Sequence, residues 1–332
     1  MGEAAALVSW LLAGAAIGCA GTWLARRYAL RRNLLDQPGE RRSHRVATPR
    51  GGGISVVVAM LAALAALAVR APGEAVAAGC AAAGLAAVAA IGWIDDHRPL
   101  SPWLRLGVHA LAGVALAAAI RLHGGGWADA ALAFLAAVVL TNVWNFMDGI
   151  DGLAASQAAL VAAAWALSAG QGPALWLGLA LVAGLCGFLP FNLPRARIFL
   201  GDVGSGALGY ALAGLLALAA LGLPAAQRIW LTLPLLPLLV DATLTLSARM
   251  VRGEAWWRPH VQHAYQAWAR AAGSHPRVTA GYAAATVLAI VVMFGMRSLG
   301  SPLIMFMYVT LVFAGGLSWR RLRGMEPRQR SK

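Results

Sequence analysis

The chain alternates long apolar runs with short polar segments. Eleven such runs begin near Ala4, Gly53, Ala75, Leu104, Trp127, Leu153, Pro173, Ser205, Arg228, Arg277 and Pro302. Each run holds about 20 residues, the length that an α-helix needs to cross the hydrocarbon core of a bilayer. Strands of a membrane barrel are shorter and alternate in polarity, and these runs do neither. The pattern predicts an all-α polytopic bundle of about 11 transmembrane helices.

The composition excludes several other classes of protein. The 332 residues are 60% hydrophobic and only 12% charged, whereas average globular chains carry about 25% charged residues. These values exclude a soluble domain, a secreted disulfide scaffold and a disordered chain. The three cysteines lie in predicted spans without CxxC spacing, which is typical of packing residues. Because no repeat or linker interrupts the sequence, we predict a single membrane domain over residues 1–332.

The charges are distributed unevenly among the loops. The sequence has 27 Lys and Arg against 13 Asp and Glu, a net charge of +14. Alternate loops and the basic tail 320–332 hold most of the arginines, and the other loops hold only Arg70, Arg121, Arg228 and Arg297. The positive-inside rule then predicts the N-terminus outside and the C-terminus inside. Nucleic-acid binding is the rival explanation of the charge, but arginines along membrane boundaries fit topology and anionic lipid headgroups better.

Five aspartates are the main candidates for chemistry. They lie where spans meet the arginine-rich loops: Asp95, Asp96, Asp148, Asp151 and Asp202. Ionisable groups near the membrane interior are costly and are therefore functional candidates. The adjacent Asp95 and Asp96 repel each other, so a metal, a cationic substrate group or a shared proton would stabilise them. Pairing with Arg98 is the structural alternative.

The segment 141–152 carries several oxygen ligands. Asn142, Asn145 and Asp148 are three residues apart, which places them on one face of a helix end. Asp151 follows, and the glycines around it permit a tight turn. Such ligands suit Mg²⁺, which binds through few carboxylates and otherwise through water and phosphate. A helix cap and turn rich in Asn and Asp is the structural alternative.

Two further segments suggest phosphate binding. Glycines surround Asp202 where the eighth span begins, and glycine-rich backbone before a helix favours phosphate. Asp202 would hold the accompanying metal, and Arg197 would neutralise phosphate charge. His260 and His263 are three residues apart, so on a helix they would share a face and meet phosphates. The alternatives are a flexible loop with topogenic arginines and an interfacial helix anchored by tryptophans.

Together these motifs resemble one family, the polyprenyl-phosphate N-acetylhexosamine-1-phosphate transferases. The resemblance covers about residues 36–266, with five motifs in matching order. They are Asp36-Gln-Pro with Ser43-His44-Arg45 and Pro49-Arg-Gly-Gly-Gly, Asp95-Asp96, Asn142 to Gly152, Phe199-Leu-Gly-Asp-Val-Gly-Ser, and His260 to Gln266. The family implies a multi-pass enzyme of the bacterial inner membrane with its active site on the cytoplasmic face.

The resemblance also implies the reaction and its partners. A HexNAc-1-phosphate would move from a UDP-N-acetylhexosamine to undecaprenyl phosphate, with Mg²⁺ or Mn²⁺ as cofactor, giving undecaprenyl-diphospho-sugar and UMP. The loop Pro259-His-Val-Gln-His-Ala-Tyr-Gln lacks the three consecutive histidines of the peptidoglycan enzyme. It looks more like the O-antigen branch, which uses N-acetylfucosamine or N-acetylquinovosamine donors. The bilayer is the third expected partner, and the resemblance is compatible with a homodimer.

The same resemblance implies roles for single residues. Asp202 matches the Mg²⁺ ligand of the family, and Asn145 lies close to the same ion. Asp95 and Asp96 match the catalytic pair, of which either would position or deprotonate the lipid phosphate. The remaining matches contact the substrates: Asp148 and Asp151 near the nucleotide, Phe199 stacked on uracil, and His44, Arg45, His260 and His263 on phosphates or sugar.

Two other classes are alternatives. A transporter of lipid-linked sugar or ions usually places polar residues near the bilayer midplane, in broken helices or inverted repeats, whereas these acids cluster at one boundary. A CDP-alcohol phosphotransferase needs the pattern DG-x-x-AR, but Asp148-Gly149 is followed by Ile-Asp-Gly. The sequence therefore favours the sugar-1-phosphate transferase.

Overall fold

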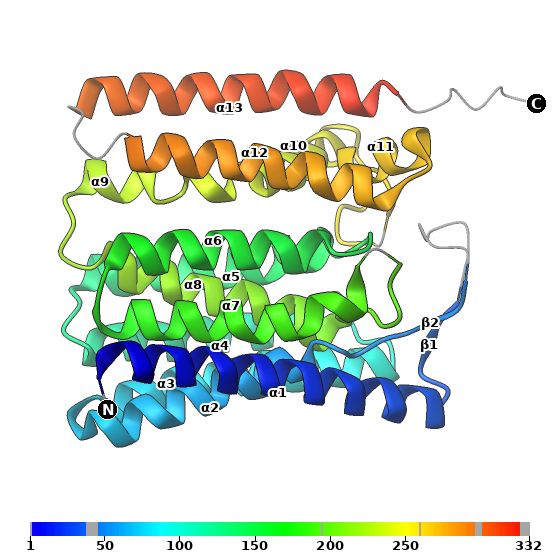
Figure 1. Cartoon of the computed structure of the whole chain (residues 1–332). Helices are drawn as coiled ribbons and strands as arrows, with labels where there is room; N and C mark the ends of the chain where they lie inside the picture. Colours follow the sequence, from blue (N-terminus) through cyan, green and yellow to red (C-terminus); the bar gives the residue numbers. More distant parts are fainter. Residues whose placement is uncertain (1, 38–45, 194, 259, 296–300, 326–332) are drawn as a thin grey trace, which may run out of the picture.

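Helices make up nearly all of the described chain. The computed structural model describes residues 2–37, 46–193, 195–258, 260–295 and 301–325 (Figure 1). Its α-helices are α1 (Glu3–Arg31), α2 (Ile54–Arg70), α3 (Ala75–His97), α4 (Pro102–Leu122), α5 (Trp127–Phe146), α6 (Leu153–Ala169), α7 (Gly172–Asn192), α8 (Asp202–Ala220), α9 (Ala225–Trp230), α10 (Leu236–Val251), α11 (Ala264–Ala272), α12 (His275–Gly295) and α13 (Ser301–Arg323). Two short 3-10 helices are η1 (Pro72–Glu74) and η2 (Leu233–Leu235).

All eleven predicted apolar runs are helical. Nine helical segments of the described residues are long and apolar enough to cross a membrane. The other two runs form α2 and α6, which are apolar but have only 17 residues each. The prediction of an all-α, multi-pass membrane protein is therefore confirmed, and the number of spans and their orientation stay predictions.

The ninth run is not one continuous α-helix. It consists of α9, η2 and α10, which together form the apolar segment Gln227–Val251. Pro234 lies in the first turn of η2 and Pro237 in the first turn of α10. Proline lacks the backbone N–H that a helix interior needs, so the α-helical pattern stops and restarts around these two residues.

A short β-ribbon that hydropathy did not predict joins α1 to α2. Its strands are β1 (Leu35–Asp36) and β2 (Thr48–Pro49), which pair antiparallel with Asp36 opposite Thr48. The Phe199 backbone N–H donates to the carbonyl of Pro49 at 2.8 Å. The ribbon therefore fixes the segment that follows β2 beside the start of α8.

α8 is the central helix of the bundle. In its apolar segment 83% of the residues are buried, against 11% in α1 and 6% in α13. It packs against α3, α5 and α6, and small residues allow the close approach that is typical of membrane helices. A Cβ atom on Gly209 would lie 2.2 Å from the carbonyl oxygen of Leu140, so only glycine fits between α8 and α5 at this point.

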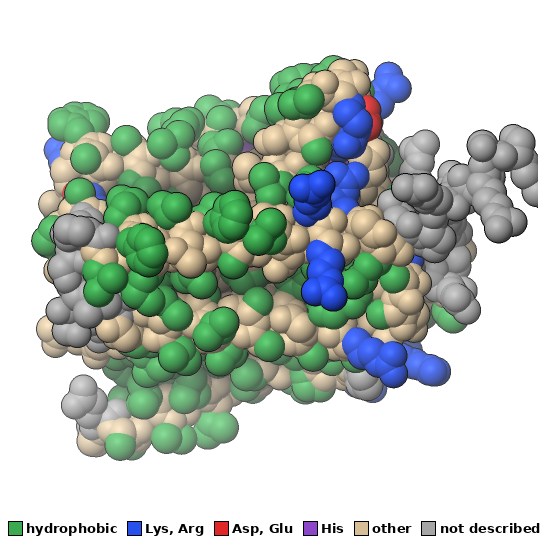
Figure 2. Space-filling model, turned by 90° about the horizontal axis from the view of Figure 1, so that it is seen from above, with side chains coloured by type: hydrophobic (Ala, Val, Ile, Leu, Met, Phe, Trp, Pro, Cys, Tyr) green, Lys and Arg blue, Asp and Glu red, His purple; other side chains and the backbone are tan. Residues whose placement is uncertain are grey.

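The face of the molecule seen in Figure 2 is largely apolar, with most of its cationic side chains gathered towards one end. Exposed apolar side chains on α13 include Phe306, Val309 and Phe313. The basic end is the one where α13 finishes with Arg320, Arg321 and Arg323 in its last turn. Because large exposed apolar patches mark membrane or protein contacts, this surface agrees with a lipid-facing helix whose arginines lie at the headgroups.

We predict that Gly209→Ala destabilises the bundle. The new methyl group would force α8 away from α5, and overpacking of this kind costs about 1–3 kcal/mol. The thermal midpoint in detergent should therefore fall. Gly107→Ala in α4 is the matched control, because a Cβ there meets nothing within 4 Å and alanine is the better helix former. Equal midpoints for the two variants would contradict the close α5–α8 contact.

Candidate active site

The predicted site residues lie at the ends of three helices that pack side by side. Asp95 and Asp96 are in the last turn of α3, Asn145 is in the last turn of α5, and Asp202 is the first residue of α8. α8 packs against both α3 and α5. Residues that are more than 100 positions apart in the sequence therefore meet at one end of the bundle.

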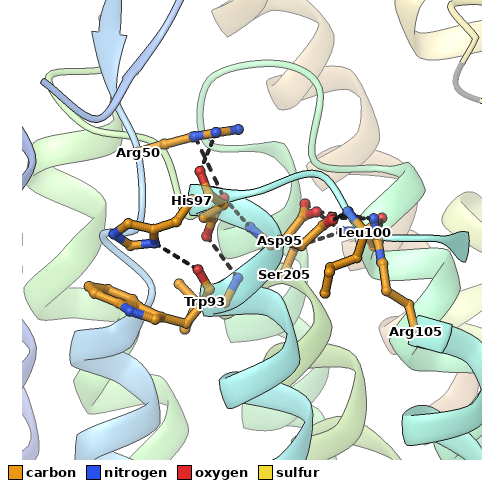
Figure 3. A network of polar contacts seen from close by, with 11 residues as sticks. Arg50, Trp93, Asp95, His97, Leu100, Arg105 and Ser205 are labelled. Atoms are coloured by element: carbon orange, nitrogen blue, oxygen red, sulfur yellow. Dashed lines mark hydrogen bonds and ion pairs between the residues drawn. The ribbon is translucent and has the colours of Figure 1, made fainter.

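Arg105, near the start of α4, binds three of these side chains. Its guanidinium lies 2.5 Å from Asp95 Oδ2, 3.2 Å from Asp202 Oδ2 and 2.8 Å from Asn145 Oδ1 (Figure 3). Asn145 Nδ2 also donates to Asp202 Oδ1 at 2.8 Å, and the Leu100 backbone N–H donates to Asp95 Oδ1 at 2.6 Å. One cation thus neutralises part of the charge of two carboxylates.

Asp96 has a different environment from Asp95. It is 2% exposed, and its two oxygens accept the backbone N–H groups of Asp202 and Val203, both at 3.1 Å. The first N–H groups of a helix have no partner within the helix, so Asp96 caps α8 from α3. Arg50 lies 3.9 Å from the same carboxylate and donates to the Asp96 carbonyl.

Glycines allow the backbone before α2 and the backbone before α8 to meet here, beside Asp96 of α3. Gly201 has φ +74, and a Cβ on it would lie 2.6 Å from Asp96 Oδ2. The N–H groups of Gly52 and Gly53 donate to the carbonyls of Phe199 and Leu200, both at 2.9 Å. The glycines after Pro49 and those around Asp202 therefore belong to one contact, which holds the start of α2 against the start of α8.

Asp148 and Asp151 occupy the turn between α5 and α6 but differ in their contacts. Asp148 is half-buried, and burial first, then the charges of Asp202 and Asp96, raise its pKa well above the usual value. The Asp151 carboxylate accepts the Ala196 N–H at 3.0 Å and faces His275 Nδ1 at 3.1 Å. Asp148 is therefore near Asp95, Asp96 and Asp202, which we call the aspartate cluster, whereas Asp151 ties this turn to α12 and to the segment before α8.

The expected helical face for the two histidines is wrong. α11 begins at Ala264, and His263 is its N-cap, so His260 lies in the preceding loop. His263 is 2% exposed and its ring centre is 4.9 Å from that of His260. Burial, followed by repulsion from His263 and Arg249, lowers the pKa of His260 to about 4. His260 is therefore neutral at neutral pH and would bind phosphate as a hydrogen-bond donor, not as a cation.

The remaining predicted residues are spread around the cluster. Phe199 is half-buried beside Leu200. Arg197 is exposed, donates to the Pro190 carbonyl at 2.5 Å and lies over the Phe191 ring, so its guanidinium is committed outside the aspartate cluster. His44 and Arg45 lie outside the described residues.

The oxygen donors at this site fit Mg²⁺ in chemical type. Asp95, Asp202 and Asn145 offer hard oxygen ligands, which Mg²⁺ prefers, and all three already surround one cationic group. No three His, Cys, Asp or Glu side chains in the described part of the chain stand together as a ready ligand set. The negative charge and the oxygen donors of Asp95, Asp202 and Asn145 suit a divalent cation. In this structure the guanidinium of Arg105 lies between these three side chains.

Sequence reasoning gave no site role to Arg105, which it counted among the loop arginines, and it included Arg50 only within the motif Pro49-Arg-Gly-Gly-Gly. The available signal for Arg105 was its place inside the first turn of a span, ten residues after Asp95. An arginine there is costly unless acids pair with it.

Comparison with known proteins identifies the family. Residues 77–220 match the family model "Glycosyl transferase family 4". A phospho-N-acetylmuramoyl-pentapeptide-transferase of Heliobacterium modesticaldum is 31% identical over 225 residues, which cover 59% of this chain and 69% of that protein. The chain belongs to glycosyl transferase family 4. The matched range runs from α3 to the end of α8 and so contains every member of the aspartate cluster.

Other relatives of this glycosyl transferase family 4 chain align with different shares of its length. A probable undecaprenyl-phosphate N-acetylglucosaminyl 1-phosphate transferase of Bacillus subtilis is 28% identical over 273 residues, 74% of each chain. A phospho-N-acetylmuramoyl-pentapeptide-transferase of Moorella thermoacetica is 39% identical over 151 residues, 37% of this chain. The alignment covers only about half of the Moorella protein, 48% of its length.

We predict that Arg105→Gln makes the stability depend on Mg²⁺. Removing one partner of a partly buried ion pair leaves carboxylate charge uncompensated, so the thermal midpoint in a chelator should fall. A cation that binds only the folded state restores stability by mass action, and millimolar MgCl₂ should therefore raise the midpoint of Arg105→Gln more than that of the wild type.

Arg228→Gln is the control for this experiment. Arg228 lies 2.5 Å from Asp129, at the opposite end of the bundle. The described residues at that end include no cluster of aspartates. MgCl₂ should leave the midpoint of Arg228→Gln unchanged. Equal Mg²⁺ shifts in both variants would contradict a cation site around Arg105.

Proposed function

We propose that this protein transfers a HexNAc-1-phosphate from a UDP-N-acetylhexosamine to undecaprenyl phosphate, giving undecaprenyl-diphospho-sugar and UMP. The observation that carries the proposal is the meeting of Asp95, Asp202 and Asn145 around Arg105 at one end of a membrane bundle. Relatives whose names specify sugar-1-phosphate transfer to undecaprenyl phosphate support it.

The position of the site suits these two substrates. A polyprenyl phosphate keeps its chain in the bilayer and its phosphate at the boundary, whereas a nucleotide sugar is dissolved in water. The aspartates lie at helix ends, at the same end of the bundle as the cationic side chains that finish α13. By the positive-inside rule this end faces the cytoplasm. A transporter would instead need polar groups along the middle of its spans.

Charge neutralisation is the main task that the site performs. Two anionic substrates repel each other, so phosphoryl transfer depends on positioning and on groups that screen the phosphates. Mg²⁺, held by Asp202 and Asn145, would supply Lewis-acid screening of the diphosphate. Arg105 and Arg50 add the cationic groups of the chain itself, and Arg105 can exchange a carboxylate partner for a phosphate without leaving the site.

We propose different roles for the two adjacent aspartates, because their contacts differ. Both oxygens of Asp96 are held by backbone N–H groups at the start of α8, so Asp96 positions Asp202. Asp95 is bound by the side chain of Arg105 and by one N–H group. We therefore assign to Asp95 the contact with the lipid phosphate, where it would orient that phosphate or accept its proton.

We also propose a donor sugar and a pathway. The loop that contains His260 and His263 favours N-acetylfucosamine or N-acetylquinovosamine donors and O-antigen assembly. Phe199 would stack on the uracil, and Asp148 would lie near the nucleotide because it borders the aspartate cluster. The raised pKa of Asp148 would let it donate a hydrogen bond while a diphosphate is nearby.

The reaction is tested by UMP release from purified protein, a UDP-HexNAc, undecaprenyl phosphate and Mg²⁺. Chelation should stop the release, and Asp202→Asn should lower kcat by about 100-fold or more, because a metal ligand is lost. Asp129→Asn, at the other end of the bundle, is the matched control and should keep the wild-type rate. Full activity of Asp202→Asn would refute the metal assignment.

A panel of donors tests the branch. We expect UDP-linked 6-deoxy-N-acetylhexosamines to give a higher kcat/KM than UDP-N-acetylglucosamine by about tenfold, since an apolar pocket rejects an analogue that merely adds a hydroxyl by only about 100-fold or less. Equal values for all donors would leave the reaction intact and refute the branch.

A further inference from the structure

Asp241 is a buried carboxylate that the proposed reaction does not use. It lies in α10 and is 2% exposed. Burying a charge is costly unless hydrogen bonds compensate it. The structure supplies them from two other elements, α11 and α12, so the function of Asp241 follows from what it binds.

Asp241 caps α11 from a neighbouring helix. Its Oδ1 accepts the Ala264 N–H at 2.8 Å and its Oδ2 accepts the Tyr265 N–H at 3.0 Å. These are the first two N–H groups of α11, which lack partners within the helix and carry the positive end of its dipole. The Tyr282 hydroxyl of α12 donates to Oδ2 at 2.7 Å, and His263 Nδ1 lies 3.5 Å from Oδ1.

The start of α11 contacts the turn between α5 and α6, which carries Asp148 and Asp151. The Tyr265 hydroxyl donates at 3.0 Å to the carbonyl of Phe146, the residue that follows Asn145. A Cβ atom on Gly149 would lie 2.1 Å from this hydroxyl, so the turn beside Asp148 packs directly against it. The Phe146 ring also stacks on His263, with centres 6.3 Å apart.

We propose that Asp241 is a positioning residue of the active site. It fixes the start of α11, and Tyr265 and His263 transmit that position to the turn 146–149. The position of this turn determines two others: that of Asn145 against Asp202, and that of Asp148 beside the aspartate cluster. A role in stability alone would need the cap but not the contact from Tyr265 to Phe146. The kinetic part of this inference rests on the proposed transferase function.

Tyr265→Phe tests the transmission, because it removes one hydroxyl and leaves the cap intact. We expect the KM for the UDP-sugar to rise about fivefold with kcat within about twofold, since the turn near the nucleotide loses its support. The thermal midpoint should stay close to the wild-type value. Tyr308→Phe is the matched control: its hydroxyl bonds Thr232 at 3.1 Å, away from the turn, and its KM should equal the wild-type KM.

Asp241→Asn tests the origin of the effect. We expect kcat/KM per folded protein to fall about tenfold, and the double variant with Tyr265→Phe to fall no further, because residues in one network are not additive. Fully additive effects, or a wild-type KM for Tyr265→Phe, would overturn the proposal. If Asp241→Asn does not fold, Tyr282→Phe, which removes one donor from the same carboxylate, replaces it in the cycle.

Chemical labelling separates this inference from the transferase proposal. His263 is buried, so diethyl pyrocarbonate should leave it unmodified in the wild type and should modify it in Asp241→Asn at a temperature where the bundle is folded. Absence of UMP release with every donor would refute the proposed function and leave this result unaffected. Protection of His263 in the folded variant would refute the positioning role of Asp241.

Discussion

The site depends on gathering carboxylates at the ends of packed membrane helices. As neighbouring carboxylates, Asp95, Asp96 and Asp202 would repel one another. Two kinds of partner offset the repulsion: the guanidinium groups of Arg105 and Arg50, and the first N–H groups of α8. Each of the three carboxylates therefore has at least one cationic or N–H partner within the protein itself.

Helix termini serve the site twice in the same way. Asp96 caps α8 from α3, and Asp241 caps α11 from α10. In both cases a buried carboxylate satisfies the free donors of another helix, and the donors in turn satisfy the charge. Each cap fixes a helix start that carries a site residue, Asp202 in one case and His263 in the other. Capping across helices thus links the packing of the bundle to the geometry of the site.

Close packing through small residues makes these contacts reachable. Gly53 approaches Gly204, and Gly92 lies against the backbone of Asp202. A larger side chain at either glycine would separate α2 or α3 from α8 and move Asp96 away from the N–H groups that it caps. The many glycines and alanines therefore act on the site as well as on the fold, because the distances between carboxylate and helix start follow from the distances between helix axes.

The segment after α10 shows where sequence reasoning failed. A spacing of three residues predicted one helical face for His260 and His263, but the helix begins after them. Its start is set by Asp241, 23 residues earlier, which captures the first N–H groups of α11. Local spacing contains no information about a cap that another helix supplies. The same limit applies to the pairing of Arg105 with Asp202 on α8, which lies far from it in the sequence.

The sequence by itself determined the helical membrane class, the apolar runs and the five junctional aspartates, because hydropathy over about 20 residues and the cost of charge near lipid are local properties. Only the tertiary structure decided which acids share a cation, which are used as helix caps, and that Asp151 is tied to α12 while Asp148 borders the cluster. Those outcomes depend on how helices far apart in the chain pack around α8, and side-chain partners across a helix interface are fixed by that packing alone.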